Sequence, residues 1–416
     1  MKVLWITNIL LPEAAARVCG DCRLKASGGW MVGAAENLLR TGQVQLVVAT
    51  VSSLVDRMTV IHGHQIVHYI IPYGKGNLRV NGEYGKYWRR IKAETIPDVV
   101  HIHGTEYSHG HAYMKECGAD KVVVSVQGLK SAICDYYRQG LSEWDIFRNI
   151  TLRDVFRGTV VREQRLFRKS AAYEREMLEM TRHIIGRTSW DRARTWAINP
   201  EAEYHFCNET LRGEFYDGSL WDYEKCHRHS IFLSQAAYPL KGLHQLLKAF
   251  PLILRHYPDA AIRVAGPDIT KCATLRDRLH LTGYGRYISM LLRKSGIGDR
   301  VTFTGSLDAL EMKREYLSCN VFVCPSSIEN SPNSLGEAQI LGVPCVACYA
   351  GGIPDMMKGN EDNLYRFEEM EMLAAKVCGI FEMKDVQASM HSAAASRHDR
   401  VLNAERLVGI YREVMK

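Results

Sequence analysis

Two glutamates, Glu329 and Glu337, stand eight residues apart on a predicted loop and the helix that follows it. Pro332 ends the loop that carries Glu329, and Asn333 or Ser334 is expected to cap the helix that carries Glu337. The amides at a helix N-terminus and the helix macrodipole both favour phosphate oxygens. Carboxylates accept hydrogen bonds from the paired hydroxyls of ribose and hexose. The pattern predicts a site for a phosphorylated sugar or nucleotide; the alternative is an ordinary capped helix with surface glutamates.

Four histidines form a second cluster, as His101-x-His103 and His109-x-His111. On a strand, alternation places His101 and His103 on the same face, and the other pair follows in the loop beyond. Three interpretations stay open for this cluster: metal ligands, residues that line a ligand cleft, and structural histidines.

The glutamates and histidines are positioned by the strands and helices around them. Apolar runs of strand length recur along the chain, with helical stretches between them. The first series of runs covers residues 3–7, 45–51, 66–70, 98–102, 121–126 and 183–187. After residue 225 the pattern starts again, with runs at 230–234, 261–266, 301–305, 321–325 and 344–347. Alternating strands and helices are typical of parallel sheets covered on both faces. We predict an α/β protein with two Rossmann-like domains that face each other across a cleft, each offering the carboxyl ends of its strands.

Composition excludes several classes of protein. The chain has 416 residues, 46% hydrophobic and 24% charged, which is unlike disordered, coiled-coil or collagen-like chains. The 53 Lys and Arg exceed the 46 Asp and Glu by 7, a dispersed excess that does not imply nucleic-acid binding. No run of 18 apolar residues is present, so we expect no membrane-spanning helix. The apolar start is broken by Thr7 and Asn8, which favours a buried strand over a secretion signal.

The twelve cysteines are scattered singly, which favours reduced thiols over a disulfide framework. Two pairs, Cys19-x-x-Cys22 and Cys345-x-x-Cys348, resemble half of a zinc or redox site. Neither has a second pair at ligand spacing, so we assign no residue to a metal.

A basic stretch lies within a predicted long amphipathic segment, residues 141–182. Residues 148–169 carry seven Lys and Arg against two acidic residues. A solvated helix face is the simpler interpretation, and docking onto an anionic membrane or a phosphate-bearing acceptor is the alternative.

The stretch 326–338 resembles the Glu-x7-Glu signature of retaining glycosyltransferases of the GT-B fold, family 4. Motifs of that family also match elsewhere, at Gly342-Val343-Pro344, the Gly351-Gly352-Ile353-Pro354-Asp355 loop, the Lys241-Gly242 pair, the linker residue Asn208 and the amino-domain loop Gly28-Gly29. The resemblance covers almost the whole chain.

This resemblance implies transfer of a sugar from a nucleotide-sugar donor, with retention at the anomeric carbon, to a saccharide or lipid-linked saccharide acceptor. It implies that Glu337 binds the ribose hydroxyls, Glu329 the donor-sugar hydroxyls and Lys241 the leaving diphosphate. The other implied donor-site residues are Asn333, Ser334, Leu335, Gly28, Gly29 and Gln127. No cofactor or metal is then required, because a lysine and a helix terminus supply the positive charge.

On the acceptor side, the strand that ends at His103 resembles the cleft-facing strand of the family, so we expect His103 and Glu106 to line the cleft. The predicted domains are residues 1–218 on the acceptor side and 219–395 for the donor. The resemblance further implies that a last helix within 396–416 crosses back to the first domain.

Two positions depart from the family pattern. Ala236 stands where many relatives carry a phosphate-binding arginine, and Gln127-Gly128 replaces a His-Gly or His-Asp pair. Arg187 follows a strand-like run and is our candidate for the missing cation, with a surface ion pair to a carboxylate such as Asp191 as the alternative.

We expect a cytoplasmic enzyme of surface polysaccharide or glycoconjugate biosynthesis, with peripheral contact to the inner face of the membrane through residues 148–169. Two alternatives stay open: a nucleotide-sugar epimerase of the same architecture, and a catalytically silent nucleotide-sugar-binding protein.

Overall fold

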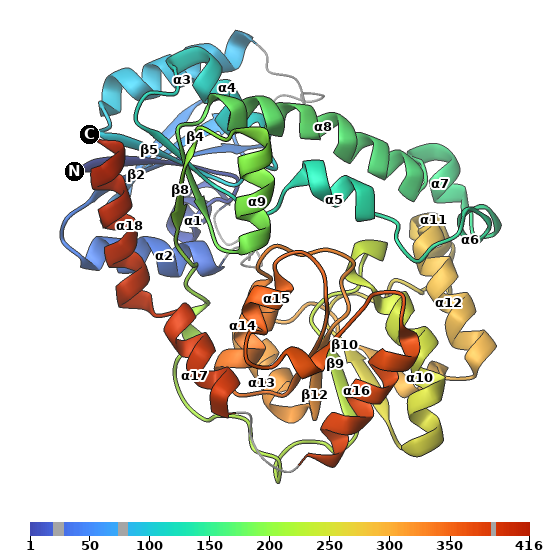
Figure 1. Ribbon diagram of the computed structural model, residues 1–416. Helices are drawn as coiled ribbons and strands as arrows, with labels where there is room; N and C mark the ends of the chain where they lie inside the picture. The colour runs from blue at the N-terminus through green and yellow to red at the C-terminus, as the bar shows by residue number, and fades with distance from the viewer. Residues whose placement is uncertain (20–28, 74–81, 384–387) are drawn as a thin grey trace. The chain divides into compact units, whose positions relative to one another are not determined.

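The computed structural model describes residues 1–19, 29–73, 82–383 and 388–416, which form two compact α/β units (Figure 1). Unit 1 comprises Met1–Ser131, Arg168–Gly213 and Arg397–Lys416, and unit 2 comprises Ala132–Phe167 and Glu214–Ser396. Each unit contains one largely parallel sheet, as the alternating pattern predicts. Residues 132–167, which the sequence analysis placed in the first domain, belong to unit 2.

Unit 1 contains an eight-stranded sheet of order β3-β4-β2-β1-β5-β6-β7-β8, in which only β3 is antiparallel to its neighbour. The strands are β1 Lys2–Thr7, β2 Gln45–Ser52, β3 Thr59–His62, β4 Ile66–Pro72, β5 Val99–His103, β6 Val122–Ser125, β7 His183–Gly186 and β8 Glu203–Phe206. The six strands predicted in this half are confirmed. Edge strands β3 and β8 escaped prediction; β8 reads Glu-Tyr-His-Phe and has no apolar run.

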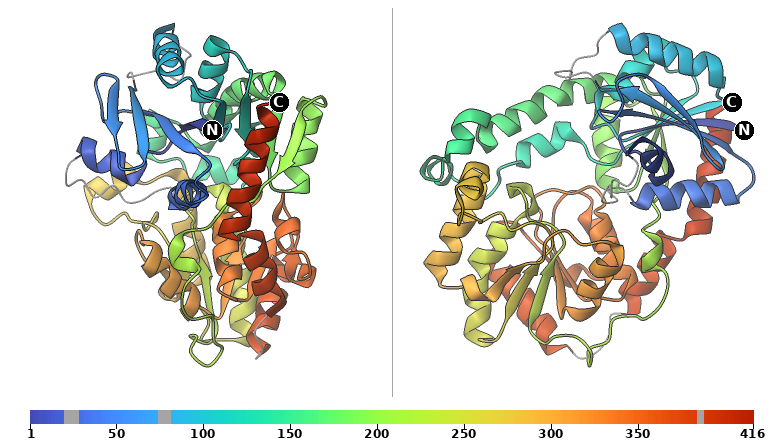
Figure 2. Two further views of the ribbon diagram at one scale, coloured as in Figure 1. Left: turned by 90° about the vertical axis from the view of Figure 1, so that its left-hand side faces the viewer. Right: turned by 180° about the vertical axis from the view of Figure 1, so that it is seen from behind.

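Helices cover both faces of this sheet. The unit 1 helices are α1 Pro12–Cys19, α2 Gly29–Arg40, α3 Gly82–Thr95, α4 Ser108–Cys117, α9 Ser189–Ile198 and α18 Arg400–Val414. Helix α18 packs against α2, and the Trp5 indole N–H donates to the Tyr411 hydroxyl over 2.9 Å. The two chain ends therefore lie close together in unit 1, as all three views show (Figures 1 and 2).

Unit 2 contains a six-stranded parallel sheet of order β11-β10-β9-β12-β13-β14. The strands are β9 Ser230–Leu233, β10 Ala261–Val264, β11 Val301–Phe303, β12 Val321–Cys324, β13 Cys345–Cys348 and β14 Leu364–Tyr365. Its helices are α6 Glu143–Arg148, α7 Leu152–Arg157, α10 Leu243–His256, α11 Leu275–His280, α12 Gly283–Ser295, α13 Ala309–Ser318, α14 Asn333–Ile340, α15 Ile353–Met356, α16 Met370–Glu382 and α17 Ala388–Arg397. The core packs α10, α12 and α16 against the sheet, with Leu246, Phe250 and Val377 fully buried.

The prediction of one long amphipathic segment over 141–182 is wrong. Three helices occupy it, α6, α7 and α8 Val160–Met180, and α8 and α5 Lys130–Tyr136 each contain a unit boundary. Helix α7 starts anew because the Thr151 side chain caps the amide of Asp154 in a capping box. Gly158, with φ +90°, ends α7. Helices α6 and α7 pack against α12 and α11, which explains why this segment belongs to unit 2.

Within the described ranges, no helix is long and apolar enough to cross a membrane. The cysteines in those ranges are free, which agrees with the prediction of reduced thiols. Cys22 lies outside the described residues.

Candidate functional site

A polar hollow in unit 2 lies at the carboxyl ends of β9 and β12, where ligands bind in open α/β sheets. It brings together two predicted catalytic residues and the start of α14. The lining residues are Leu233, Ser234, Gln235, Lys241, Met312, Val323, Cys324, Pro325, Ser326, Glu329, Pro332, Asn333 and Ser334.

Lys241 and Glu329 form an ion pair in this hollow. The Lys241 ammonium lies 2.5 Å from Glu329 Oε1, and the two side chains are only 19% and 15% exposed. Burial lowers the pKa of Lys241, but the negative charge of Glu329 opposes this and leaves the pKa above its ordinary value. The ammonium therefore stays protonated and can attract an anionic ligand.

Gly242 holds Lys241 against the end of β12. Its φ is +72°, and a Cβ atom at this position would stand 1.8 Å from the carbonyl oxygen of Pro325. Only glycine combines this backbone conformation with so close an approach. The Lys-Gly pair is thus explained: the glycine lets the turn approach the strand end that faces the hollow.

A second glycine holds Glu329. Gly351 has φ +59°, and a Cβ atom there would stand 1.9 Å from the Glu329 carbonyl oxygen, which also accepts a hydrogen bond from the Gly352 amide over 2.9 Å. The Gly-Gly-x-Pro-acid loop therefore contacts the backbone of Glu329 directly. Two glycine contacts, at distant positions in the sequence, fix the two ends of the ion pair.

Helix α14 begins at the hollow, but not as expected. Pro332 is its N-cap residue, and neither Asn333 nor Ser334 caps it, because both lie inside the first turn. In the described part of the chain, Pro332 provides no side-chain cap that would compete with an anion for the first-turn amides, which suits a phosphate site. The Leu335 amide donates to the Pro332 carbonyl oxygen over 3.0 Å, and its side chain is fully buried. Leu335 is therefore a less suitable phosphate ligand than Ser334.

Glu337 and Ala236 are both buried. Glu337 lies one turn inside α14, 5% exposed, and does not line the hollow. Ala236 packs in the core of unit 2, whereas its neighbour Gln235 is exposed and lines the hollow. A cation at position 236 would displace packed side chains, so Gln235 is the position that could carry one into the hollow.

A separate cavity in unit 1 lies at the carboxyl ends of β5, β6 and β7. It unites four residues singled out from the sequence, His101, His103, Arg187 and Asn208. The remaining lining residues are Trp30, Ala34, Asn37, Ser125, Ile185, Cys207, Glu209, Thr210, Asn403, Ala404 and Leu407. Within the described parts of the chain, His103 Nε2 is buried and has no hydrogen-bond partner. Burial, with the nearby Arg187, lowers the pKa of His103 to about 3, so the ring is neutral and its Nε2 can bond a hydroxyl.

Arg187 already has a strong partner in unit 1. Its guanidinium lies 2.9 Å from Glu209 Oε2 and donates to the Val126 carbonyl oxygen over 2.5 Å. The alternative partner named from the sequence, Asp191, bonds the Arg187 backbone amide instead. The role of Arg187 toward a diphosphate stays a prediction.

Glu106 and Gln127 lie together beside Gly104, just past the end of β5. Glu106 accepts a hydrogen bond from the Gly128 amide over 2.8 Å. Burial raises the pKa of Glu106 to about 7, with the charge of Glu174 adding to the effect. Gly29 begins α2 and packs close to Arg212, while Gly28 lies outside the described residues.

Two of the four clustered histidines, His101 and His111, have side-chain hydrogen bonds within unit 1. His101 bonds the Tyr411 hydroxyl and the Ser125 hydroxyl, which makes it structural, and His111 bonds Glu176. Across the described ranges, one group of side chains is close enough to hold a metal ion, His183, Glu203 and His205 on β7 and β8. None of these three lines either cavity described above.

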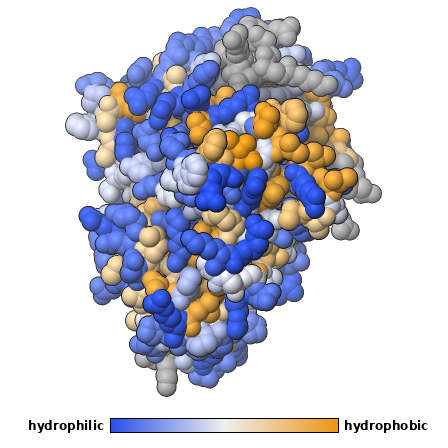
Figure 3. Space-filling model, turned by 90° about the vertical axis from the view of Figure 1, so that its right-hand side faces the viewer, coloured by the Kyte–Doolittle hydropathy of each residue, from blue (hydrophilic) through white to orange (hydrophobic). Residues whose placement is uncertain are grey.

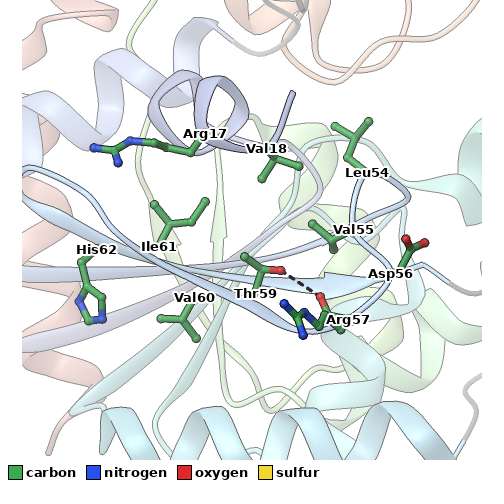
Figure 4. A pocket seen from close by; sticks show the side chains of 10 residues that line it. All are labelled: Arg17, Val18, Leu54, Val55, Asp56, Arg57, Thr59, Val60, Ile61 and His62. Atoms are coloured by element: carbon green, nitrogen blue, oxygen red, sulfur yellow. Dashed lines mark hydrogen bonds between the residues drawn. The ribbon is translucent and has the colours of Figure 1, made fainter. Parts of the chain in front are cut away.

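Figure 4 shows another hollow of unit 1, which lies beside edge strand β3 and α1. Its polar lining residues are Arg17, Asp56, Arg57, Thr59 and His62, and the others are aliphatic. The Thr59 hydroxyl donates to the Arg57 carbonyl oxygen over 3.1 Å (Figure 4). It holds no residue predicted from the sequence to act in a site.

Residues 227–397, which contain the hollow of unit 2, match the family described as glycosyl transferases group 1. The match covers less than half of the chain. The matched segment includes Lys241, Glu329, Glu337 and α14.

Two curated relatives resemble the chain in sequence. The sulfoquinovosyl transferase of Arabidopsis thaliana is 32% identical over 123 residues, 30% of this chain and 22% of that protein. A GDP-mannose-dependent alpha-(1-6)-phosphatidylinositol monomannoside mannosyltransferase of Mycolicibacterium smegmatis is 25% identical over 171 residues, 38% of this chain and 40% of that protein. The chain thus matches less than half the length of either relative.

Two solved structures resemble the whole chain. Sucrose-phosphate synthase of Thermosynechococcus elongatus has a TM-score of 0.68 at 17% identity, covering 99% of this chain and 98% of that one. HepE of Anabaena in complex with UDP has a TM-score of 0.66 at 13% identity, covering 99% and 100%. At these identities the likeness shows a shared fold, the GT-B architecture of two parallel-sheet domains.

Sequence reasoning missed two carboxylates. Glu209 is the ion-pair partner of Arg187, and Glu174 is fully buried, where it accepts hydrogen bonds from Thr105 and from the amides of Lys130 and Ser131. Neither lies in a recognisable motif. The polar character of the 208–213 linker was the only signal that could have drawn attention to Glu209.

Proposed function

We propose that the chain is a retaining glycosyltransferase that moves a sugar from a nucleotide-sugar donor to a saccharide or lipid-linked saccharide acceptor. One observation carries the proposal: in the segment that matches the glycosyl transferases group 1 family, the Lys241–Glu329 ion pair and the start of α14 line the same hollow. A charged ammonium and helix amides suit a diphosphate, and a carboxylate beside them suits sugar hydroxyls.

In the proposed reaction, negative charge grows on the diphosphate as the glycosidic bond breaks. The Lys241 ammonium and the first-turn amides near Ser334 are fixed before the reaction, so they stabilise this charge without reorganising. Glu329 accepts hydrogen bonds from the donor-sugar hydroxyls and orients the anomeric carbon. We assign Glu329 no nucleophilic step, and we assign ribose binding to Glu337.

We further propose that the reaction needs no divalent metal. The Lys241 ammonium and the α14 amides supply the positive charge that a metal ion provides to a leaving diphosphate in other transferases. Activity that is unchanged by excess EDTA is the expected result.

The names of the relatives support both substrates. The mannosyltransferase is named for GDP-mannose and a phosphatidylinositol monomannoside, and HepE was solved with UDP. A lipid-linked saccharide is therefore our first choice of acceptor. On the acceptor side we assign Glu106 and His103, which lines the unit 1 cavity and whose Nε2 has no hydrogen-bond partner among the described residues. Synthesis of surface polysaccharide or glycoconjugate in the cytoplasm is the corresponding cellular role.

A thermal-shift screen with nucleoside diphosphates and their hexoses tests the donor class. A ligand at 100 times its dissociation constant stabilises the folded chain by about 2.7 kcal/mol, so the correct base raises Tm clearly. Product analysis with that donor then separates the alternatives. A glycosylated acceptor supports the proposal, an epimer of the donor sugar supports an epimerase, and tight binding without transfer or hydrolysis supports a silent binding protein.

A further inference from the structure

Three short helices of unit 2 expose large apolar side chains. We call the group the apolar surface; its members are Trp144, Phe147, Leu152, Val155, Phe156, Leu275 and Leu279, from α6, α7 and α11. Their exposed fractions run from 59% to 84%. Figure 3 views the right-hand side of Figure 1, where α6, α7 and α11 are labelled, and shows apolar side chains gathered among hydrophilic ones. Scattered apolar residues are normal on a protein surface, but a gathered set marks an interaction site.

These side chains are held in place although they are exposed. Helices α6 and α11 bury no residue, so core packing does not hold them. Capping boxes begin all three helices, at Ser142, Thr151 and Thr274. The Thr151 hydroxyl also donates to the Leu281 carbonyl oxygen over 2.8 Å, which connects the start of α7 to the end of α11.

The charges around the apolar surface are mainly positive. Residues 148–167 carry five arginines and two acidic residues. One of the two acids, Asp154, is buried in the α7 capping box, and in α6 Asp145 is bonded in the same way. Arg148 and Arg157 close the last turns of α6 and α7, and the Arg148 guanidinium lies 5.7 Å from the centre of the Trp144 ring. Asp145 and Asp154 cap helices, whereas Glu143 on α6 is 76% exposed and pairs with Arg138. The arginines of residues 148–167 still outnumber the acidic residues there, so the surface is mainly positive.

We propose that the apolar surface docks on an anionic lipid bilayer. Aromatic and aliphatic side chains beside arginines match the boundary between acyl chains and headgroups, where tryptophan is favoured and cations pair with lipid phosphates. A symmetric dimer of two copies would place the same patch, and its arginines, on both sides of one interface, so charge disfavours it. The proposal refines the sequence-based expectation for residues 148–169. The apolar side chains of residues 144–156 and of α11 insert into the bilayer, and the arginines attract the anionic headgroups.

Vesicle flotation of the full chain tests the proposal, in the absence of nucleotide. One set of vesicles contains only phosphatidylcholine and the other adds about a third phosphatidylglycerol. The wild-type chain is expected to float with the acidic vesicles at low salt and to lose binding as salt is raised. The double variant Leu152→Gln/Phe156→Gln is expected to bind the acidic vesicles with an affinity at least about tenfold lower, because two inserting side chains are removed.

Two further variants keep the test interpretable. Leu310→Gln removes an apolar side chain that is 58% exposed on α13 of the same unit, and it should bind like the wild type. Arg148→Gln/Arg157→Gln should lower binding to acidic vesicles and leave the weak binding to neutral ones unchanged. Since all four substituted side chains of the two double variants are at the surface, the fold is expected to survive, as Tm will report.

Three results would overturn the proposal. The first is equal flotation of the wild type and the Leu152→Gln/Phe156→Gln variant, and the second is equal binding of the wild type to neutral and acidic vesicles. The third is a wild-type chain that binds no vesicles but forms a dimer in solution, which this variant abolishes. Flotation measures no turnover, so a failure here leaves the proposed glycosyl transfer untouched. Conversely, a chain that floats as expected but transfers no sugar would reject only the proposed function.

Discussion

Gly351 lies so close to Glu329 that a Cβ atom at position 351 would stand 1.9 Å from the Glu329 carbonyl oxygen. The two residues are 22 positions apart, and the Gly352 amide adds a 2.9 Å hydrogen bond to the same oxygen. This contact fixes the backbone from which the Glu329 carboxylate reaches Lys241. The Gly-Gly loop thus supports the ion pair without contributing a charge to it.

Gly351→Ala is therefore expected to cost more stability and donor affinity than the positive φ of Gly351 alone would cause. The control is Gly359→Ala, in the same unit, where φ is +82° and an added Cβ would meet no atom within 4 Å. The control should lose about 1 kcal/mol of stability and keep its affinity for the donor. Gly351→Ala should lose more stability and bind the intact donor more weakly. Equal effects on donor binding would show that the contact does not position Glu329.

The two glutamates should fail differently when substituted. Glu337→Ala is expected to weaken binding of the nucleoside diphosphate itself by about 1.5–3 kcal/mol, through lost charged hydrogen bonds to ribose. Glu329→Ala should spare the nucleoside diphosphate and weaken the intact donor. Calorimetric titration with both ligands distinguishes them, and an equal loss of nucleoside diphosphate affinity in both variants would contradict the assignment. Because Glu337 is buried, the Tm of the Glu337→Ala variant must be measured together with its affinities.

Substitution of Arg187 tests whether this residue only stabilises the fold or also binds the diphosphate. Arg187→Ala leaves the largely buried carboxylate of Glu209 without its ion-pair partner, which typically costs about 3–5 kcal/mol. Arg187→Ala/Glu209→Gln removes both charges and should recover much of that loss. If Arg187 also serves the diphosphate, the stable double variant will bind nucleoside diphosphate more weakly and nucleoside unchanged. An unaltered ratio of the two affinities would make Arg187 purely structural.

Glu106 should make stability fall as pH rises. Its pKa in the folded chain is about 7, against an ordinary value of 4.5, so between these pH values the folded chain holds a proton that the unfolded chain has lost. Stability is full below the lower value and declines up to pH 7, by at most about 1.4 kcal/mol per pH unit. In Glu106→Gln the decline in Tm between pH 5 and 7 should be smaller, while the exposed Glu36→Gln control should follow the wild type. Parallel curves for all three proteins would reject the shifted pKa.

The sequence allowed prediction where one local pattern determines the result. Apolar runs such as 230–234 and 321–325 form strands because buried parallel strands need continuous hydrophobicity. The resemblance of two separate motifs implied that Lys241 and Glu329 serve one donor, and the structure places both at one hollow; their ion pair was not predicted. The break between α7 and α8 at Gly158 was missed because the amphipathic pattern continues through it and hides the local signals, such as the capping box that begins α7 at Thr151. Glu209 was missed because its role depends on Arg187, a partner brought near only by the sheet.

Lys241 is the residue on which the proposed departure of the diphosphate depends most directly. The measurement is the kcat of Lys241→Ala with the donor identified by thermal shift, beside Lys225→Ala, a control at a lysine whose side chain is 81% exposed in the same unit. We predict a fall of about 10²–10³ for Lys241→Ala, the effect of removing one preorganised donor to the developing charge, and no change for the control. A fall of less than about tenfold in a variant that keeps its fold, as judged by Tm and circular dichroism, would contradict the proposed role of the ion pair in diphosphate departure.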